Sequence, residues 1–433
     1  MAFSIAKNRA VVIARNAVLL MIPLIATPRS IILFAIMGAS FCPRSFSGLS
    51  KSSCPGFAQL LLACLTSNNS FMLKSYSISI VHLYVAITKL TIEEFIPLCK
   101  QFPVFDVRSE GEFEHAHIPG AHSLPLFNNE ERKIVGTAYK QESKQKAIKI
   151  GLKYFGAKMV KMVEAVEKIT AASENKTVLV HCWRGGMRSA GVAWLLDLYG
   201  FKVYTLVGGY KVYRNWVLRQ FVKDYPIQIV GGYTGSGKTE VLQELQRRGA
   251  AIIDLEGLAH HKGSAFGNLG QPPQPSQEMF ENLLAEALHQ KKTLVTERHP
   301  FIWMEDESQR IGDVNIPTVL FKQMRNKKVC FLEIPFEERL QYIIEGYGKF
   351  NKEFLVNAVI RIKKRLGGLE TKTAINCLIE DDIPGCFSIL LKYYDKGYYA
   401  GSLRRENPAE LIHTIECPKV DPVGNAIRLL QVD

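Results

Sequence analysis

This 433-residue sequence lacks closely spaced pairs of cysteines. Its nine cysteines include no C-x-x-C pair and no set with the spacing of a zinc site. This argues against a disulfide-stapled secreted fold and against a zinc finger. An odd, dispersed set of cysteines is typical of reduced thiols, so we expect the protein to be cytoplasmic.

Acidic residues are absent from the first 71 positions. The apolar runs at 17–26 and 31–41 are separated by Arg29, and neither reaches the roughly 20 residues of a membrane span. We therefore expect no stable membrane insertion. Residues 1–71 fit three interpretations: a mis-assigned start with the working protein beginning near Met72, a targeting segment, or a genuine appendage.

Beyond this extension the composition is that of an ordinary globular protein. Over the whole chain 47% of residues are apolar and 22% are charged, so a large core can form. The net charge of +13 is compatible with a polyanionic partner. Strands alternating with helices predict α/β units with parallel sheets. We expect a first unit at 85–210, a connecting helix at 211–224, and a second unit at 225–430 with a basic, aromatic helical part.

A cysteine surrounded by glycine and arginine follows an apolar strand expected at 177–180. The stretch HCWRGGMRS (181–189) leads into a helix expected at 189–199. Glycines let the backbone turn its N–H groups inward, and the helix adds its positive end. Such an anion-binding loop should lower the pKa of Cys182 from roughly 8.5 to about 6 and make the thiol a nucleophile. The loop's predicted catalytic residues are Cys182, Arg184 and Arg188, and its anion-binding residues are Trp183, Gly185 and Gly186.

A phosphate-binding loop is predicted at GYTGSGKT (232–239), which fits G-x-x-x-x-G-K-[ST] between an expected strand at 227–230 and a helix. Lys238 would reach a terminal phosphate, and the Thr239 hydroxyl would hold Mg²⁺. Carboxylates at or after the strands expected at 250–254 and 301–304 would bind the metal through water. The phosphate-binding set is Gly232, Gly235, Ser236, Gly237, Lys238 and Thr239, and its acidic partners are Asp254, Glu305 and Asp306.

The stretch VFDVRSEGEFEHAHIPGAHSLPL (104–126) and the cysteine loop resemble the rhodanese family over about residues 90–210. The resemblance implies a rhodanese-like parallel-sheet domain and adds Asp106 and Arg108 to the catalytic set. Many sulfur-carrying rhodanese loops place four residues between the cysteine and the residue that closes the loop. Here five residues separate Cys182 from Arg188, as in cysteine phosphatases. The longer loop suits a phosphate or a selenium-bearing group, and spacing alone does not separate the two.

A rhodanese-like unit followed by a P-loop unit resembles the bacterial tRNA 2-selenouridine synthase family over about residues 85–400. PLFNNEERKIVGTAYKQ (125–141), IDLEGLAHHKGSAFG (253–267) and EDESQRIG (305–312) carry the resemblance with both loops. It implies a P-loop NTPase-like second domain and a transferase that turns wobble 2-thiouridine of tRNA into 2-selenouridine. The implied substrates are geranyl diphosphate, which S-geranylates the base, and selenophosphate, the selenium donor. Cys182 would then form an S-selanylcysteine, and the P-loop would bind the diphosphate.

The same resemblance implies partners. The tRNA would carry wobble 2-thiouridine, with lysine, glutamate and glutamine tRNAs expected, and the enzyme that makes selenophosphate would be a further partner. A basic helical region at 346–368 is a candidate for tRNA phosphate contact, although a solvated face explains it equally well. The candidate residues are Lys349, Lys352, Arg361, Lys363, Lys364 and Arg365.

Two other functions remain open on sequence grounds. The His-Cys-x₅-Arg spacing also fits a cysteine-dependent phosphatase or a sulfurtransferase fused to a nucleotide-dependent kinase. No aspartate closely follows the loop, so Asp106 would have to serve such a phosphatase as general acid. A nucleotide-gated sulfur carrier or tRNA-binding scaffold without catalysis is the other alternative.

Overall fold

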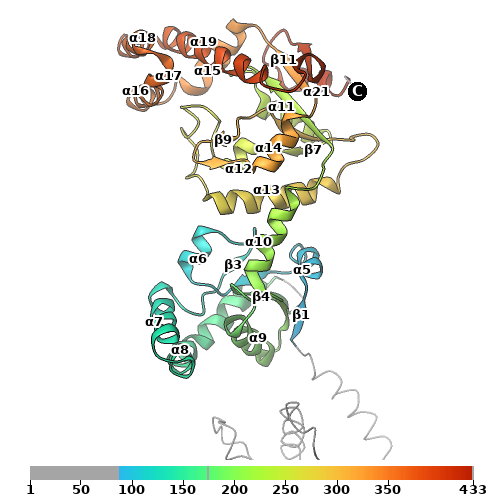
Figure 1. Ribbon diagram of the computed structural model, residues 1–433, viewed down its shortest axis with the longest axis vertical. Helices are drawn as coiled ribbons and strands as arrows, with labels where there is room; N and C mark the ends of the chain where they lie inside the picture. The colour runs from blue at the N-terminus through green and yellow to red at the C-terminus, as the bar shows by residue number, and fades with distance from the viewer. Residues whose placement is uncertain (1–86, 173–174, 432–433) are drawn as a thin grey trace, which may run out of the picture. The chain divides into compact units, whose positions relative to one another are not determined.

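The computed structural model describes residues 87–172 and 175–431, so the extension at 1–71 lies outside the described residues. The described residues fall within one compact unit, Val85–Asp433. They form two parallel sheets with helices around them, which confirms the α/β prediction. Figure 1 gives the labels used below.

The first sheet has five parallel strands in the order β1-β5-β4-β2-β3. All five residues of β4, TVLVH, are buried, as expected for a parallel strand covered on both faces. The register pairs Asp106 with His181, so the carboxyl ends of β2 and β4 meet at one edge. The strands are β1 (Thr88–Leu90), β2 (Val104–Asp106), β3 (His122–Ser123), β4 (Thr177–His181) and β5 (Lys202–Leu206).

The helices of this first half include a long hairpin inserted between β3 and β4. The residues between Asn128 and Thr170 form two helices, α7 and α8. Ser143 lies between them and caps α8, because its hydroxyl accepts from the Lys146 N–H. Of the helices in the described ranges, none combines the length and apolar composition needed to cross a bilayer. The helices are α5 (Ile92–Leu98), α6 (Glu110–His115), α7 (Asn129–Gln141), α8 (Lys144–Thr170) and α9 (Met187–Tyr199).

The second sheet is also parallel, in the order β12-β11-β6-β8-β7. Its central strand β6 is buried throughout and leads directly into the predicted phosphate loop. An antiparallel pair, β9–β10, lies apart from this sheet. The strands are β6 (Ile227–Gly232), β7 (Ala251–Ile253), β8 (Ile302–Glu305), β9 (Arg310–Ile311), β10 (Val314–Asn315), β11 (Val329–Glu333) and β12 (Ile412–Glu416).

The connecting helix, α10, spans Gly209–Gln220 rather than 211–224. The basic, aromatic helical part contains several helices, and it is interrupted where Asp381 takes a positive φ of 63° and Asp382 caps a new helix. The remaining helices are α11 (Lys238–Arg247), α12 (Leu255–Ala259), α13 (Gln277–Lys292), α14 (Thr318–Arg325), α15 (Phe336–Tyr347), α16 (Lys352–Arg361), α17 (Lys363–Leu366), α18 (Gly368–Ile379), α19 (Ile383–Ser402), α20 (Pro408–Leu411) and α21 (Pro422–Leu429).

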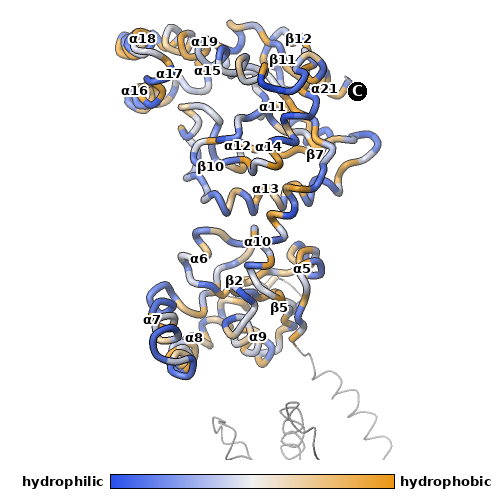
Figure 2. The backbone as a smooth tube through the Cα atoms, viewed as in Figure 1, coloured by the Kyte–Doolittle hydropathy of each residue, from blue (hydrophilic) through white to orange (hydrophobic). Residues whose placement is uncertain are grey.

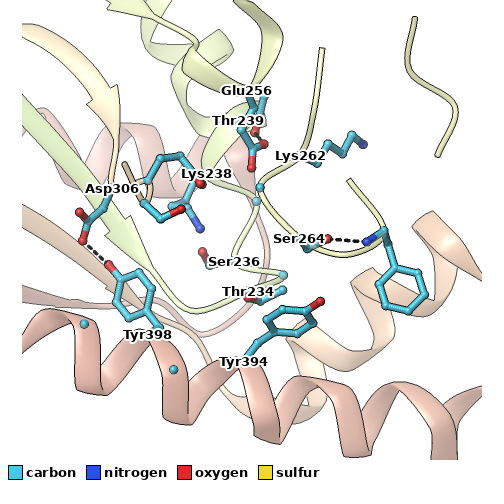
Figure 3. Close-up of a pocket in the computed structure, with 18 of the residues that line it drawn as sticks. Thr234, Ser236, Lys238, Thr239, Glu256, Lys262, Ser264, Asp306, Tyr394 and Tyr398 are labelled. Atoms are coloured by element: carbon cyan, nitrogen blue, oxygen red, sulfur yellow. Dashed lines mark hydrogen bonds between the residues drawn. The ribbon is translucent and has the colours of Figure 1, made fainter. Parts of the chain in front are cut away.

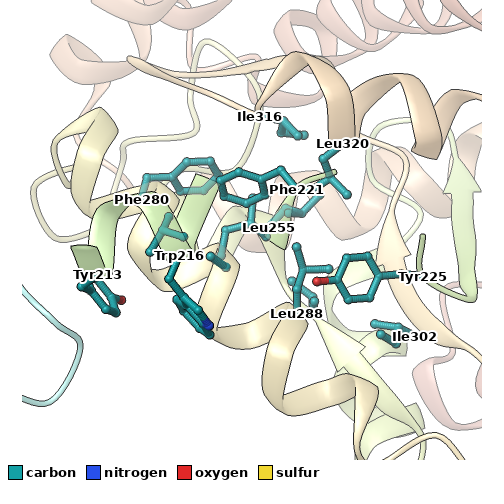
Figure 4. Packing of buried hydrophobic residues seen from close by; sticks show 14 of the residues in the cluster. Tyr213, Trp216, Phe221, Tyr225, Leu255, Phe280, Leu288, Ile302, Ile316 and Leu320 are labelled. Atoms are coloured by element: carbon teal, nitrogen blue, oxygen red, sulfur yellow. The ribbon is translucent and has the colours of Figure 1, made fainter. Parts of the chain in front are cut away.

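One buried hydrophobic cluster contains residues from both sheets. Figure 4 shows Tyr213, Trp216 and Phe221 of the α10 region among Phe280 and Leu288 of α13. The same cluster includes Leu206 from β5 and Ile302 from β8. Fully burying one large apolar side chain contributes about 1.5–3 kcal/mol, so the core around α10 holds the two halves together.

Candidate functional site

The cysteine loop lies between β4 and α9, as the sequence predicts. Gly185 has a φ of 63°, and a Cβ there would lie 2.6 Å from the Leu206 carbonyl oxygen. Gly209 closes the loop from the other side, where a Cβ would lie 2.2 Å from the Cys182 carbonyl oxygen. The Tyr210 N–H donates to that carbonyl at 2.9 Å. Glycine is needed at both positions because the backbones of the two segments touch.

The Cys182 thiol is only 3% exposed and lies 3.3 Å from the Ser189 hydroxyl. Burial acts to raise the pKa of the thiol. Hydrogen bonds from the Ser189 side chain and from the backbone N–H groups of Ser189, Arg184 and Gly186 outweigh burial, and the pKa is lowered. The direction agrees with the sequence prediction, and backbone N–H groups are among its causes, as the loop argument requires.

The two loop arginines have different surroundings. Arg188 donates to Glu112 at 3.0 Å, and Glu112 also pairs with Arg132 at 2.8 Å. Arg184 is exposed, and the half-buried ring of Trp183 lies 5.7 Å from the Tyr210 ring, centroid to centroid. Arg188 is therefore held in place by a carboxylate, and Arg184 is the loop cation facing solvent.

Asp106 and Arg108, predicted as catalytic, form a buried ion pair with a distance of 2.5 Å. Burial acts to raise the pKa of Asp106, but His181 and Arg108 outweigh it and the pKa is lowered. Arg108 also donates to the Ala116 carbonyl at 2.7 Å and lies 3.8 Å from the Tyr210 ring centroid. The Asp106 carboxylate is therefore held in a buried ion pair, and a catalytic role for Asp106 and Arg108 stays a prediction.

The predicted phosphate loop has the expected local geometry. Gly232, Gly235 and Gly237 all have positive φ angles, and the Lys238 ammonium donates to the Gly232 carbonyl at 3.1 Å. The Ser236 hydroxyl is buried and has no hydrogen-bond partner among the described residues. A buried hydroxyl without a partner is costly, and a phosphate oxygen would satisfy it.

The predicted acidic partners differ in their surroundings, and Asp254 and Asp306 both line the cavity beside the phosphate loop. Glu305 is fully buried, accepts from the Leu255 N–H at 2.9 Å, and burial raises its pKa well above the usual value. Asp306 binds the Tyr398 hydroxyl at 2.7 Å and Arg405 at 2.5 Å. Asp254 caps α12 through the Gly257 N–H at 2.6 Å and lines the cavity beside the loop.

The carboxylate at the phosphate loop is Glu256. Its Oε2 accepts from the Thr239 hydroxyl at 3.0 Å (Figure 3). Burial raises the pKa of Glu256, and that of the neighbouring Glu307 more strongly. No group of three potential metal ligands occurs among the described residues. Thr239 and Glu256 suit a Mg²⁺ that takes its other ligands from phosphate and water, and Mg²⁺ binding stays a prediction.

A cavity of about 1560 Å³ opens beside the phosphate loop. Its lining includes Lys238, Thr239 and Glu256 as well as a set of aromatic side chains. Figure 3 shows Tyr394 and Tyr398 of α19 across from the loop. Arg339 ties this region to the loop by donating to the Thr234 carbonyl at 3.0 Å. The aromatic lining consists of Phe266, Phe321, Tyr342, Tyr347, Phe350, Phe387, Tyr394 and Tyr398.

The candidate tRNA-binding residues fall into two groups. Lys352 pairs with Asp381 at 2.5 Å, and Arg361 donates to the Ala265 carbonyl at 2.9 Å, so both make intramolecular contacts. Lys349, the third member of this first group, lines the cavity. The second group is exposed on α17 and consists of Lys363, Lys364 and Arg365.

Several residues at the two loops were missed by sequence reasoning. Ser189 stands inside the quoted cysteine stretch, and a hydroxyl beside a predicted thiolate could have indicated it. Glu256 stands two residues after Asp254, and a second carboxylate beside a predicted acidic partner could have indicated it. Glu112, Gly209 and Tyr398 come from distant segments, and their contacts carry no local signal.

Known proteins match the chain in both halves. A family model described as the rhodanese-like domain matches residues 92–215, and one described as the tRNA 2-selenouridine synthase AAA domain matches residues 225–411. Proteins named tRNA 2-selenouridine synthase are 35% identical in Hydrogenovibrio crunogenus, 35% in Sulfurovum sp. and 37% in Pseudomonas syringae pv. syringae. The matches cover 62%, 65% and 61% of this chain and 77%, 79% and 76% of those relatives.

Proposed function

Because the chain belongs to the tRNA 2-selenouridine synthase family, we propose that it converts wobble 2-thiouridine of tRNA into 2-selenouridine by way of an S-geranylated base. We assign one chemical step to each half of the chain. The phosphate loop serves geranylation, and the cysteine loop serves selenium transfer. The enzyme is then a transferase for two groups in sequence, with geranyl diphosphate and selenophosphate as its substrates.

The observation that carries the geranyl step is the cavity. Its lining offers Lys238 and the Ser236 hydroxyl, which suit a diphosphate. The aromatic side chains of the lining suit an apolar chain. In this step the sulfur at C2 of the base forms a bond to the geranyl carbon, and the C–O bond to diphosphate breaks. Lys238 would stabilise the negative charge of the departing diphosphate. Alkylation turns the sulfur into a better leaving group for the second step.

The selenium step is assigned to Cys182, which is the anion-loop thiol whose pKa is lowered. In the S-selanylcysteine route the thiolate attacks selenium and the Se–P bond breaks with its electrons on phosphorus, which leaves as phosphite. The selanyl selenium then displaces geranyl thiol from C2. A small-molecule thiol reduces the remaining S–Se bond and is itself oxidised to a disulfide.

A phosphatase-like route at the same thiol is the second candidate. It is favoured by the Arg188 spacing and by Ser189 lying against the sulfur. Here the thiolate attacks phosphorus and releases hydrogen selenide, which displaces geranyl thiol. Water then hydrolyses the phosphocysteine to phosphate. The buried Asp106–Arg108 pair argues against the independent phosphatase considered above, because its proposed general acid is not available.

The test incubates the whole chain with thiolated tRNA, geranyl diphosphate and selenophosphate, followed by mass analysis of the nucleosides. We expect 2-selenouridine from the wild type and accumulation of S-geranyl-2-thiouridine with Cys182→Ser. Selenouridine formation by Cys182→Ser at the wild-type rate would remove Cys182 from the mechanism. Phosphorus NMR of the product mixture distinguishes the two routes, because one yields phosphite and the other phosphate.

A further inference from the structure

Helix α8 has an exposed face lined with lysine. Seven of its 27 residues are lysine and only two are acidic. Residues three, four, seven or eight positions apart lie on related faces of a helix, and five exposed lysines follow such spacings over about 33 Å of its length. We call this face the basic stripe, and its members are Lys146, Lys149, Lys153, Lys161 and Lys168.

Most of this charge is not neutralised by the protein. Among the described residues only Lys146 of the stripe has a salt-bridge partner, Glu142. Of the two acidic residues of α8, Glu167 accepts from the Tyr199 hydroxyl at 2.7 Å, and Glu164 is exposed. Figure 2 shows many hydrophilic positions along α7 and α8. Glu164 lies on this face between Lys161 and Lys168, so the excess positive charge comes from Lys149, Lys153, Lys161 and Lys168. This excess attracts a polyanion.

The opposite face of α8 decides between kinds of polyanion. Phe155, Met162, Val163 and Val166 are buried in the core of the first sheet, together with Val180. An interfacial membrane helix needs a free apolar face, and α8 has used its own for packing. A rigid row of lysines on a packed helix instead suits the regularly charged backbone of a nucleic acid.

A chain of ion pairs connects helix α8 to the cysteine loop. Lys158, between Lys153 and Lys161 in sequence, pairs with Glu131 in the first turn of α7. The next residue, Arg132, pairs with Glu112, and Glu112 also holds Arg188 of the loop. The hairpin that carries the stripe is therefore tied by ion pairs to the loop that carries Cys182.

We propose that the basic stripe of α8 binds the phosphate backbone of the tRNA substrate while its wobble base is at the cysteine loop. The proposal rests on the proposed function for the identity of the polyanion. It moves the main RNA contact from the region around 349–365 to the hairpin inserted in the first half. Lys→Glu changes on the stripe should weaken binding regardless of the tRNA's sequence, since phosphate contacts carry no base information.

The experiment measures binding of fluorescently labelled thiolated tRNA to the whole chain by anisotropy, between about 50 and 200 mM salt, where phosphate contacts are sensitive. The variant is Lys149→Glu with Lys153→Glu. We expect its Kd to rise roughly tenfold or more, since two contacts are lost and two repulsive charges added. The uncharged pair Lys149→Gln with Lys153→Gln should reduce the salt slope of log K by about two.

Two comparison variants change the net charge by the same amount. Lys176→Glu with Lys202→Glu alters exposed lysines at the starts of β4 and β5, at the sheet edge away from the cysteine loop, and should change Kd less than about threefold. Lys363→Glu with Lys364→Glu tests α17 and should behave similarly. Equal thermal midpoints and equal rates of Cys182 alkylation would show that each variant is folded with an intact loop.

The outcomes separate this inference from the function it rests on. Wild type that binds and modifies tRNA, with a stripe variant within threefold of it, would overturn the stripe alone. A large loss confined to the α17 variant, or an equal loss in the β4–β5 control, would overturn it as well. Wild type that neither binds nor modifies tRNA would overturn both the stripe and the proposed function.

Discussion

Tyr210 joins the reactive cysteine to the other half of the molecule. Its backbone N–H donates to the Cys182 carbonyl at 2.9 Å, and its hydroxyl donates to Glu278 of α13 at 2.9 Å. The same hydroxyl accepts from Asn282 at 2.8 Å, and Asn282 also donates to the His117 carbonyl at 2.8 Å. One side chain therefore fixes the position of α13 relative to the cysteine loop.

Tyr210→Phe should lower the free energy of unfolding by about 1–3 kcal/mol, because Glu278 and Asn282 lose a buried partner. The alkylation rate of Cys182 should stay within about twofold, since the backbone bond to its carbonyl remains. Urea unfolding and thiol alkylation measure the two quantities. Tyr204→Phe, at a half-buried tyrosine of β5, is the matched control and should cost less than half as much. Equal losses in both variants would refute the assigned role.

Ser189→Ala should shift the reactivity of Cys182 to higher pH. The hydroxyl helps to hold the pKa of the thiol low against burial, so its loss raises that pKa and reduces the thiolate fraction at any pH below it. The pH profile of iodoacetamide alkylation, read at Cys182 by peptide mapping, measures the shift. Burial raises the pKa of Cys99 and of Cys386 to about 12, so their labelling should remain slow in both proteins. An unshifted profile would exclude Ser189 from stabilising the thiolate.

Gly209→Ala should abolish selenium transfer. A Cβ at this position would lie 2.2 Å from the Cys182 carbonyl and 2.5 Å from the Gly185 nitrogen, and φ is +59°. Both the contact and the strain push the two segments apart. Gly186→Ala is the control, because its Cβ would meet nothing within 4 Å and its φ is −101°. Selenouridine formation with geranylated tRNA measures both, and similar activity in the two variants would contradict this account.

Lys238→Ala should slow geranylation by roughly ten- to a few-hundredfold. A charge-assisted contact to a departing diphosphate is worth on the order of 1.5–3 kcal/mol, at about 1.4 kcal/mol per tenfold. Selenation of tRNA that is already geranylated should be nearly unchanged, because that step belongs to Cys182. Single-turnover assays of the separate steps measure both rates. If selenation were lost and geranylation spared, the assignment of loops to steps would be reversed.

Sequence reasoning located both loops because each is a local strand–turn–helix segment whose glycines and charges stand within nine residues. It did not find the residues that hold those segments in place. Glu112 contacts Arg188 across 76 positions, and Tyr398 contacts Gly232 across 166. Such pairs depend on packing of the whole chain. The same limitation applies to Asp306, whose contacts with Tyr398 and Arg405 could not be read from local sequence.

Helix α10 (Gly209–Gln220) carries Tyr210 at the cysteine loop. Phe221, directly after the helix, is buried in the cluster that contains residues of the second sheet. Under the proposed assignment, one helix therefore joins the loop for selenium transfer to the half that carries the loop for geranylation. A proteolytic cut within the twelve residues of α10 would separate the cysteine loop from the phosphate loop and disrupt the core that the two halves share.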